Sequence, residues 1–305
     1  MTMKRRLGLV CAWLLATALV VACAHTIGWR NAGDVLAAAR PAWLAAAVAA
    51  NALILVAWTA FWRSLLPPRR VAAGDAAGAP AVGNSRMFEI VSIASALMNT
   101  LPFGGGHASS IVLLATRGGI GRRSALSVLA LDQLGEGVAK VGLFLLVALV
   151  VPLPTWMRAG VTTASVAVAA WFIALIIASR WARELALLKS WRRAARALGC
   201  VAAMKLAELL AIVAVQHSFG VDVTLSRSLL VLAALVLATM LPLTPGNLGT
   251  YEASVFLAYR YLGVSPELAL GLAVAQHACF LLPSVGVGYA FLSRHALSRS
   301  AIASR

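Results

Sequence analysis

Residues 241–252 read Leu-Pro-Leu-Thr-Pro-Gly-Asn-Leu-Gly-Thr-Tyr-Glu and interrupt a long apolar part of the chain. Apolar residues precede the stretch at 229–240 and follow it, so we expect it to lie at membrane depth. Its two prolines and two glycines cannot continue a helix. In hydrocarbon, irregular backbone is tolerated only where protein or a water-filled cavity covers it. The sequence therefore predicts a buried helix break, and such a break is a candidate site.

The composition is that of an integral membrane protein. Hydrophobic residues make up 61% of the 305 residues and charged residues 12%, whereas a soluble domain carries about 25% charged residues. The mean hydropathy is +0.88. We therefore expect one polytopic membrane domain over residues 1–305. The four cysteines lie in apolar segments without a CxxC pair, which predicts packing residues.

Six apolar segments are long enough to cross a bilayer, which takes about 20 residues. We expect these spans at residues 7–24, 42–62, 125–151, 161–179, 200–219 and 268–292. The first could instead be a cleaved signal peptide, because Val20-Val21-Ala22-Cys23 resembles a lipoprotein cleavage site. The composition of residues 63–86 predicts a flexible loop. Residues 180–196 are strongly basic and predict an interfacial helix.

Two further apolar segments, 87–118 and 229–262, are broken in the middle. The first contains Asn99-Thr100-Leu101-Pro102-Phe103-Gly104-Gly105-Gly106-His107, and the second contains the stretch quoted above. Each arm is too short to span a bilayer comfortably alone. We therefore predict that each segment is a re-entrant helical hairpin, which returns to the side it left.

The placement of basic residues then indicates a topology. With two re-entrant hairpins and six spans, both termini lie on one face, and that face carries 19 Lys and Arg against 5 on the other. The positive-inside rule places such a face in the cytoplasm. We expect a bacterial inner membrane protein with both termini cytoplasmic. The net charge of +16 thus reflects topology and attraction to anionic lipids rather than nucleic acid binding.

The two halves of the chain resemble each other. Leu101-Pro102 matches Leu241-Pro242 at an offset of 140 residues, and residues 124–133 align with 268–277 at an offset of 144. Repeat 1 covers about 87–151 and repeat 2 about 229–292. Three spans separate the hairpins, so the second enters from the opposite face. We predict an all-α integral membrane protein with about six transmembrane helices and two re-entrant helical hairpins in an inverted repeat, an arrangement that places transporter sites at the repeat interface.

Charged residues inside the spans are the first candidate site group. Asp132, Glu136 and Lys140 are spaced i, i+4, i+8 and share one helix face, and Lys205 and Glu208 do the same at i, i+3. A charge at bilayer depth costs a few kcal/mol or more, so such groups pair and face an interior cavity. Two interpretations stay open: mutual neutralisation that joins two helices, or a polar path for protons or a charged headgroup.

The helix restarts form the second group. Their free backbone N–H groups favour an anion such as phosphate, and Glu252 either complements a helix dipole or acts functionally. His107 and His277 are isolated and predict packed or cavity-lining residues rather than metal ligands. No P-loop, HExxH, GxSxG or metal-spaced Cys/His cluster occurs, so we expect no cofactor and no metal. Further hydrogen-bond donors in these restarts are Ser109, Ser110, Asn247, Thr250 and Tyr251.

These motifs resemble the transmembrane region of the lysylphosphatidylglycerol synthase family, also described as the flippase-like domain family. The second half matches in Pro245, Gly246, Gly249 and Glu252, followed by Leu262-Gly263-Val264, Pro283 and Gly286. The first half matches in Asn99, Pro102 and Gly105. The family's Glu-Arg-x-x-Asp reads Asp132-Gln133-x-x-Glu136 here, so headgroup binding through that arginine is in doubt. The soluble lysyl-transferase domain of bifunctional relatives is not expected here, and some stand-alone relatives are associated with hopanoid biosynthesis.

The resemblance implies translocation of a lipid or lipid-linked molecule between leaflets, with membrane lipids of anionic headgroup as partners. Two alternatives stay open: an intramembrane lipid-modifying enzyme using Asp132 and Glu252, or a non-catalytic accessory subunit beside lipid- or glycan-synthesis enzymes. No catalytic residue is predicted. The residues expected to bind the translocated molecule are Asn99, Gly105, His107, Asp132, Gln133, Glu136, Lys140, Gly246, Asn247, Gly249, Glu252 and His277.

Overall fold

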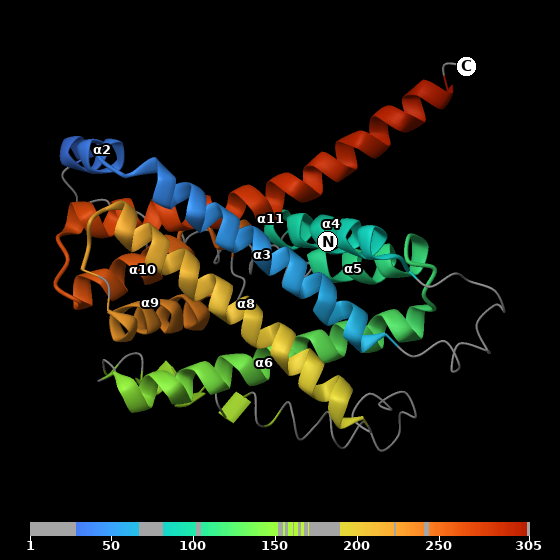
Figure 1. The fold of residues 1–305 in the computed structure, drawn as a ribbon, viewed down its shortest axis with the longest axis horizontal. Coiled ribbons are helices and arrows are strands. Elements are labelled where there is room, and N and C mark those ends of the chain that lie inside the picture. The colour runs from blue at the N-terminus through green and yellow to red at the C-terminus, as the bar shows by residue number, and fades with distance from the viewer. Residues whose placement is uncertain are drawn as a thin grey trace, which may run out of the picture.

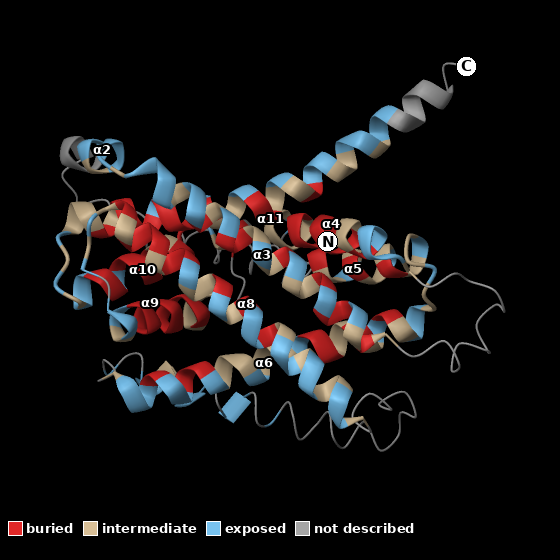
Figure 2. Cartoon of the chain, viewed as in Figure 1, coloured by how far each residue is buried: buried red, intermediate tan, exposed pale blue. Residues whose placement is uncertain are grey.

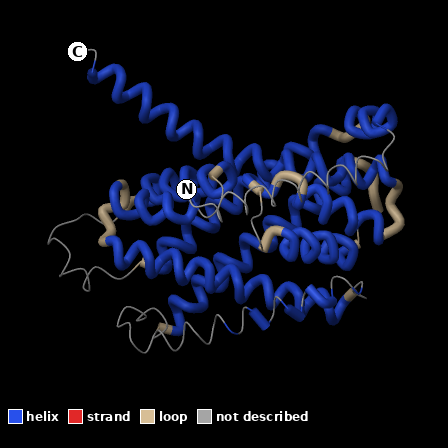
Figure 3. Tube along the Cα trace, turned by 180° about the vertical axis from the view of Figure 1, so that it is seen from behind, coloured by secondary structure: helices blue, strands red, loops and turns tan. Residues whose placement is uncertain are grey.

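The fold is entirely helical over the part of the chain that is described. A computed structural model describes residues 29–66, 82–101, 105–151, 190–222, 224–240 and 244–303, together with isolated residues between 155 and 170. Every regular element among them is a helix (Figure 3), which confirms that the protein is all-α, as predicted. The predicted span 7–24 and most of the predicted span 161–179 lie outside the described residues.

Four helices of the described chain are long and apolar enough to cross a membrane. They lie on four of the predicted spans. The four are α3 (Pro41–Leu65), α6 (Arg122–Val150), α8 (Trp191–Ser218) and α11 (Pro266–Ala303). A shorter helix, α2 (Trp29–Ala37), packs against α11 (Figure 1).

Two predicted boundaries differ from the structure. Helix α8 begins at Trp191, nine residues before the predicted span, so the end of the basic segment forms its first turns rather than a separate interfacial helix. Arginine is a good helix former, and its long side chain reaches the interface from a helix end. The connection between α3 and α4 is shorter than the predicted loop 63–86, because α3 runs to Leu65 and α4 (Asn84–Thr100) begins at Asn84.

The outer faces of the long helices expose large apolar side chains. Leu149 on α6 is 87% exposed, and Leu206 and Leu210 on α8 are also exposed, as is Leu282 on α11 (Figure 2). Water rarely contacts so large an apolar surface on a monomeric protein. Lipid is a suitable solvent for it, so these faces are consistent with long helices inside a bilayer.

The two interrupted segments fold as pairs of short helices. Helix α4 packs against α5 (Gly105–Thr116), and α9 (Leu225–Ala238) packs against α10 (Thr250–Tyr261) beyond the 3-10 turn η3 (Pro245–Asn247). At Gly106 the two helices of the first pair touch, since an added Cβ would lie 2.3 Å from Met98 Cα. Each of the two interrupted segments is therefore broken at the position that its prolines and glycines predicted.

The two pairs of short helices meet at their broken ends. Gly246 of η3 has a φ of 61°, and a Cβ there would lie 3.1 Å from the backbone oxygen of Asn99 at the end of α4. The long helix of each half also packs on the short helices of the other half: α11 lies along α4, and α6 lies against α9 (Figure 1). The described residues beside the two breaks thus lie against each other, where the two halves of the chain meet.

The described arginines separate to the two ends of the bundle. Arg63, Arg86 and Arg117 lie at the ends of α3, α4 and α5, and Arg193 near the start of α8 lines one groove together with the last turn of α3. The α2, α9 and α10 ends hold fewer arginines among the described residues. The arginines that the structure describes therefore gather at one end of the bundle, and the orientation of that end toward the cytoplasm stays a prediction.

Two glycines of α11 should respond in opposite ways to substitution by alanine. A Cβ at Gly288 would lie 2.3 Å from the Ser92 oxygen of α4, whereas a Cβ at Gly286 meets no atom within 4 Å. We expect Gly288→Ala to destabilise the protein by about 1–3 kcal/mol through overpacking, and Gly286→Ala to be neutral or stabilising by up to about 1 kcal/mol. Unfolding midpoints in detergent measure both. Equal midpoints for the two variants would contradict the close α4–α11 packing.

Candidate functional site

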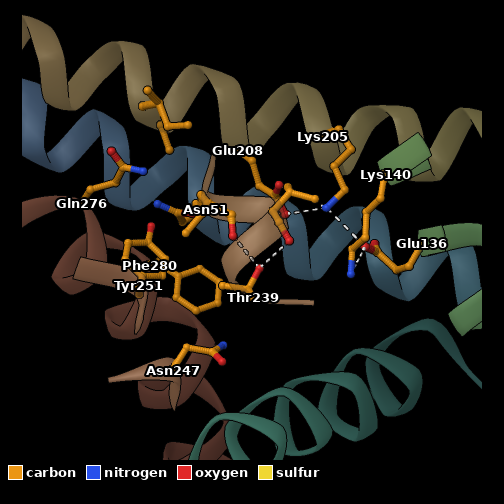
Figure 4. A pocket seen from close by; sticks show the side chains of 14 residues that line it. Asn51, Glu136, Lys140, Lys205, Glu208, Thr239, Asn247, Tyr251, Gln276 and Phe280 are labelled. Carbon is orange, nitrogen blue, oxygen red and sulfur yellow. Dashed lines mark hydrogen bonds and ion pairs between the residues drawn. The ribbon is translucent and has the colours of Figure 1, made fainter. Parts of the chain in front are cut away.

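A polar cavity of about 210 Å³ lies where both halves of the chain meet (Figure 4). Its walls come from α3, α6, α8, α9, η3, α10 and α11, so elements of both predicted repeats contribute. Four ionisable side chains and several uncharged polar ones line it. These polar residues are Asn51, Glu136, Lys140, Lys205, Glu208, Thr239, Asn247, Tyr251 and Gln276.

The four charges form one network across α6 and α8. Lys205 Nζ lies 3.0 Å from Glu208 Oε1 and 3.2 Å from Glu136 Oε2, so its ammonium group joins two carboxylates. Lys140 Nζ lies farther away, 3.9 Å from Glu136 Oε2. Figure 4 shows Lys205 between the two carboxylates. Two lysines and two glutamates give no net charge, which lowers the cost of holding them at this depth.

Lys140 has the loosest pairing of the four charges. Its contact with Glu136 is near the limit for an ion pair, and about a quarter of its side chain is accessible at the cavity. An ammonium group in this state can donate hydrogen bonds to a further acceptor without breaking the Lys205 pairs. Lys140 is therefore the cation of the network with the most unused pairing capacity.

Two amides on the wall opposite the network add unused hydrogen-bonding capacity. Asn247 Oδ1 is buried and has no hydrogen-bond partner among the described residues. The Gln276 amide makes no bond of standard geometry within the same part of the chain, although it lies within electrostatic range of the Tyr251 hydroxyl. Buried polar groups are normally satisfied by protein, water or ligand. These amides therefore mark a side of the cavity that water or a ligand can contact.

Asp132 lies on the same face of α6 but does not line the cavity. It is 1% exposed, and its Oδ1 accepts hydrogen bonds of 2.7 Å from both Trp58 Nε1 and Trp62 Nε1 of α3. Gln133 Nε2 donates to the other oxygen at 3.2 Å, and Gln133 is exposed. Asp132 therefore joins α6 to α3 one turn away from Glu136.

A second polar group lies at the break between η3 and α10. Glu252 Oε2 accepts the Gly249 N–H at 2.7 Å and caps the start of α10. Its other oxygen, Oε1, lies 2.7 Å from His277 Nδ1, and His277 Nε2 lies 2.9 Å from the Gly246 carbonyl oxygen. His277 is only 2% exposed. The imidazole thus ties α11 to both sides of the break.

The hydrogen-bond geometry fixes how many protons this group holds. The Gly246 carbonyl oxygen can only accept, so His277 Nε2 must carry a hydrogen. With its hydrogen on Nε2, a neutral imidazole has only an acceptor at Nδ1, and an ionised Glu252 carboxylate is also only an acceptor. The 2.7 Å contact between Nδ1 and Oε1 therefore requires one additional hydrogen, carried by either His277 or Glu252. The His277 ring also stacks on Tyr251 at 4.1 Å between centroids, and Tyr251 lines the cavity.

The remaining predicted site residues lie around the two breaks. Asn99 Nδ2 donates to the Ser95 oxygen, and Asn99 shares an apolar surface depression with Gly246. Gly105 begins α5, and His107, in its first turn, is within electrostatic range of Lys140. The described residues contain no cluster of three or more His, Cys, Asp or Glu that could hold a metal ion.

Sequence reasoning missed several members of the site. Trp58 and Trp62 were not singled out, nor were Asn51 and Thr239, although polar side chains within apolar spans are a usable signal. Gln276 was aligned with Asp132 in the proposed repeat but was not assigned to the site. Phe280, which lines the cavity beside Tyr251, carried no signal in the sequence.

The sequence profile described as lysylphosphatidylglycerol synthase TM region matches residues 7–288. The chain belongs to this family. The match covers both halves, including both helix breaks and the charged stretches of α6 and α8. No curated protein and no solved structure matches the chain significantly.

Membership in the lysylphosphatidylglycerol synthase TM region family makes this a membrane protein of a family linked to lipid handling. The family's expected acids occupy Asp132 and Glu136, and the structure gives them different surroundings: Asp132 is held by tryptophans and Glu136 by lysines. Gln133, at the position where the resemblance leads us to expect arginine, is exposed and does not line the cavity. The cations that line the cavity are Lys140 and Lys205.

Removing the Lys205 charge from the network should lower the stability of the protein, and removing the Glu208 charge as well should restore most of that stability. Lys205→Met leaves Glu208 without its partner and is expected to destabilise the protein by about 3 kcal/mol or more. Lys205→Met with Glu208→Gln removes one charge of each sign and leaves the Glu136–Lys140 pair, so most of the stability should return. Unfolding midpoints of the two variants in detergent test this. If the double variant is no more stable than the single one, Glu208 is not held by Lys205.

Substitutions at Glu252 should distinguish the contribution of its hydrogen bonds from that of its negative charge. Glutamine can accept from the Gly249 N–H and donate to His277 Nδ1, so Glu252→Gln should keep the fold within about 1 kcal/mol of the parent stability. Glu252→Ala loses both bonds and should cost about 1–3 kcal/mol. Thermal unfolding of both variants provides the comparison. A large loss in Glu252→Gln would mean that the negative charge itself stabilises the break.

Proposed function

We propose that this protein translocates a lipid or lipid-linked molecule between membrane leaflets and that the headgroup passes through the central cavity. The observation that carries this proposal is the neutral network of two lysines and two glutamates around a cavity formed by both halves of the chain. Charged groups at bilayer depth are rare and are usually functional. A network that only joined two helices would not need a hollow beside it.

The size of the cavity favours a headgroup over a whole lipid. At about 210 Å³ it is smaller than the roughly 300–1,000 Å³ of pockets that enclose small molecules. Acyl chains would remain outside in apolar surroundings. A translocase needs this division, since it must cover the polar headgroup and can leave the chains in hydrocarbon.

An apolar groove next to the cavity offers a place for the chains. The groove has a volume of about 300 Å³ and lies between α3, α6 and α8, with Arg193 at its basic end. Along α8 it is lined by Ala194, Ala197 and Val201, and the cavity begins at Lys205 on the same helix face. Headgroup and acyl chain could therefore move along α8 together.

The arrangement we propose is six transmembrane helices and two re-entrant hairpins, α4–α5 and α9–α10, related as an inverted repeat. The reciprocal packing of α11 on α4 and α6 on α9 supports it. Inverted repeats permit alternating access to a site between them. The gathering of arginines at one end supports a bacterial inner membrane location with both termini cytoplasmic.

We propose an anionic headgroup as the chemical class of substrate, with Lys140 as its first partner. The geometry gives less support to an intramembrane enzyme, because Asp132 and Glu252 line no common cavity and each is held by other side chains. An accessory role beside lipid-synthesis enzymes is distinguished by experiment, since an accessory protein would not move lipid alone. A hopanoid substrate remains a prediction of the resemblance.

Leaflet exchange in liposomes tests the proposal. The purified protein is reconstituted with fluorescent anionic or neutral lipids, and the accessible fraction of dye is followed with a quencher. Ala211→Phe places a ring in the cavity and should reduce exchange to the level of protein-free liposomes. Leu210→Phe is the matched control, because Leu210 is exposed on the next position of the same helix and does not line the cavity.

The outcomes separate the alternatives. Exchange of anionic lipid that Ala211→Phe abolishes and Leu210→Phe leaves unchanged supports translocation through the cavity. Exchange that is indifferent to both variants would locate the lipid path elsewhere. Covalently altered lipid in the extracts would favour the enzyme, and absence of exchange with every lipid tested would favour the accessory role.

A further inference from the structure

A second cavity, of about 650 Å³, lies at the basic end of the bundle and shares no lining residue with the central cavity. It opens where the first turns of α4, the residue after α5 and the C-terminal part of α11 come together (Figure 1). The side chains that matter for its chemistry are Arg86, Phe88, Glu89, Arg117, Phe291 and His295. None of these residues has a role in the proposed translocation path.

The charges of this cavity are unbalanced. Glu89 is the single carboxylate among its lining residues, and its Oε1 accepts from both Arg117 Nη1 at 2.5 Å and His295 Nε2 at 2.7 Å. Arg86 is exposed and has no ion-pair partner among the described residues. Two guanidinium groups thus face one carboxylate.

The wall that complements these cations is apolar. Phe88 and Phe291 lie edge to face with centroids 6.2 Å apart, one from α4 and one from α11. A ligand here meets cationic groups and aromatic carbon together. The volume lies within the roughly 300–1,000 Å³ range of small-molecule sites, and a phosphate ion alone would leave much of it empty.

We propose that this cavity binds the phosphate headgroup of an anionic phospholipid from the leaflet at the basic end. Arginine forks match phosphate oxygens, and the cavity lies at the basic end of the bundle, where anionic headgroups are attracted. The glycerol and upper acyl carbons would contact Phe88 and Phe291. The bound lipid joins α11 to the α4–α5 pair and does not travel through the central cavity.

Retention of lipid by the purified protein tests the site without any transport measurement. The full-length protein is extracted from vesicles of equal phosphatidylglycerol and phosphatidylcholine content, and the co-purified lipid is counted by native mass spectrometry. We expect the parent protein to retain phosphatidylglycerol preferentially. The double variant Arg86→Gln with Arg117→Gln should lose roughly tenfold or more of that preference, since each cation near the headgroup contributes severalfold.

The matched control changes the same charge on the same face. Arg122→Gln with Arg123→Gln removes two exposed arginines at the start of α6 that do not line this cavity, and the preference should persist. An equal loss in both double variants would overturn the site, because it would show a general effect of surface charge. An unchanged preference in Arg86→Gln with Arg117→Gln would overturn it as well.

Glu89→Gln gives a result that an unfolded protein cannot produce. It removes the negative charge that competes with the headgroup for Arg117, so retention of phosphatidylglycerol should rise above that of the parent. A fall in retention would contradict the proposal. The last comparison is titration with inorganic phosphate, followed by thermal unfolding. Suppose that phosphate stabilises the parent protein but not the Arg86→Gln, Arg117→Gln variant, and that the parent retains no lipid. The cavity would then be assigned to a free phosphate ester instead of a lipid.

Discussion

Backbone that leaves helical geometry inside hydrocarbon must be covered by its own protein, and the architecture of this chain follows from that requirement. The breaks after α4 and before α10 lie against each other, with Gly246 beside the Asn99 carbonyl. Each long helix then packs across the short helices of the other half. His277 joins the second break to α11, because its ring nitrogens contact the Gly246 oxygen and the carboxylate that caps α10. The cavity lies beside the second break, where Thr239, Asn247 and Tyr251 line it.

The same interior separates two kinds of acid. Glu136 and Glu208 are held by lysines at the cavity wall, whereas Asp132 is held by two indole N–H groups and has no contact with that wall. Asp132 therefore serves the joint between α3 and α6, and Glu136 serves the cavity, although they lie one turn apart on one helix face. Glu252 is intermediate, since it caps a helix and also shares a proton with His277.

The sequence predicted the features that depend on local chemistry. Prolines and glycines located both breaks, apolar length located α3, α6, α8 and α11, and the four-residue spacing placed Glu136 and Lys140 on one face. Contacts across the bundle were not predictable in this way. Spacing along α6 cannot show that tryptophans of α3 face Asp132, and nothing local pairs Glu252 with a histidine 25 residues away. Boundaries also moved, because arginines at the start of α8 extend the helix instead of ending it.

The neutrality of the ion network has an electrical consequence. With two lysines and two glutamates, the empty central cavity presents no net charge to the membrane field. In the translocation proposed above, an anionic headgroup would make the occupied cavity negative by one unit. A transmembrane voltage acts on one elementary charge with about 2.3 kcal/mol per 100 mV. The voltage would therefore bias the step in which the loaded protein moves its cargo and leave the return of the empty protein unaffected, so the direction of net movement can be set without a second substrate.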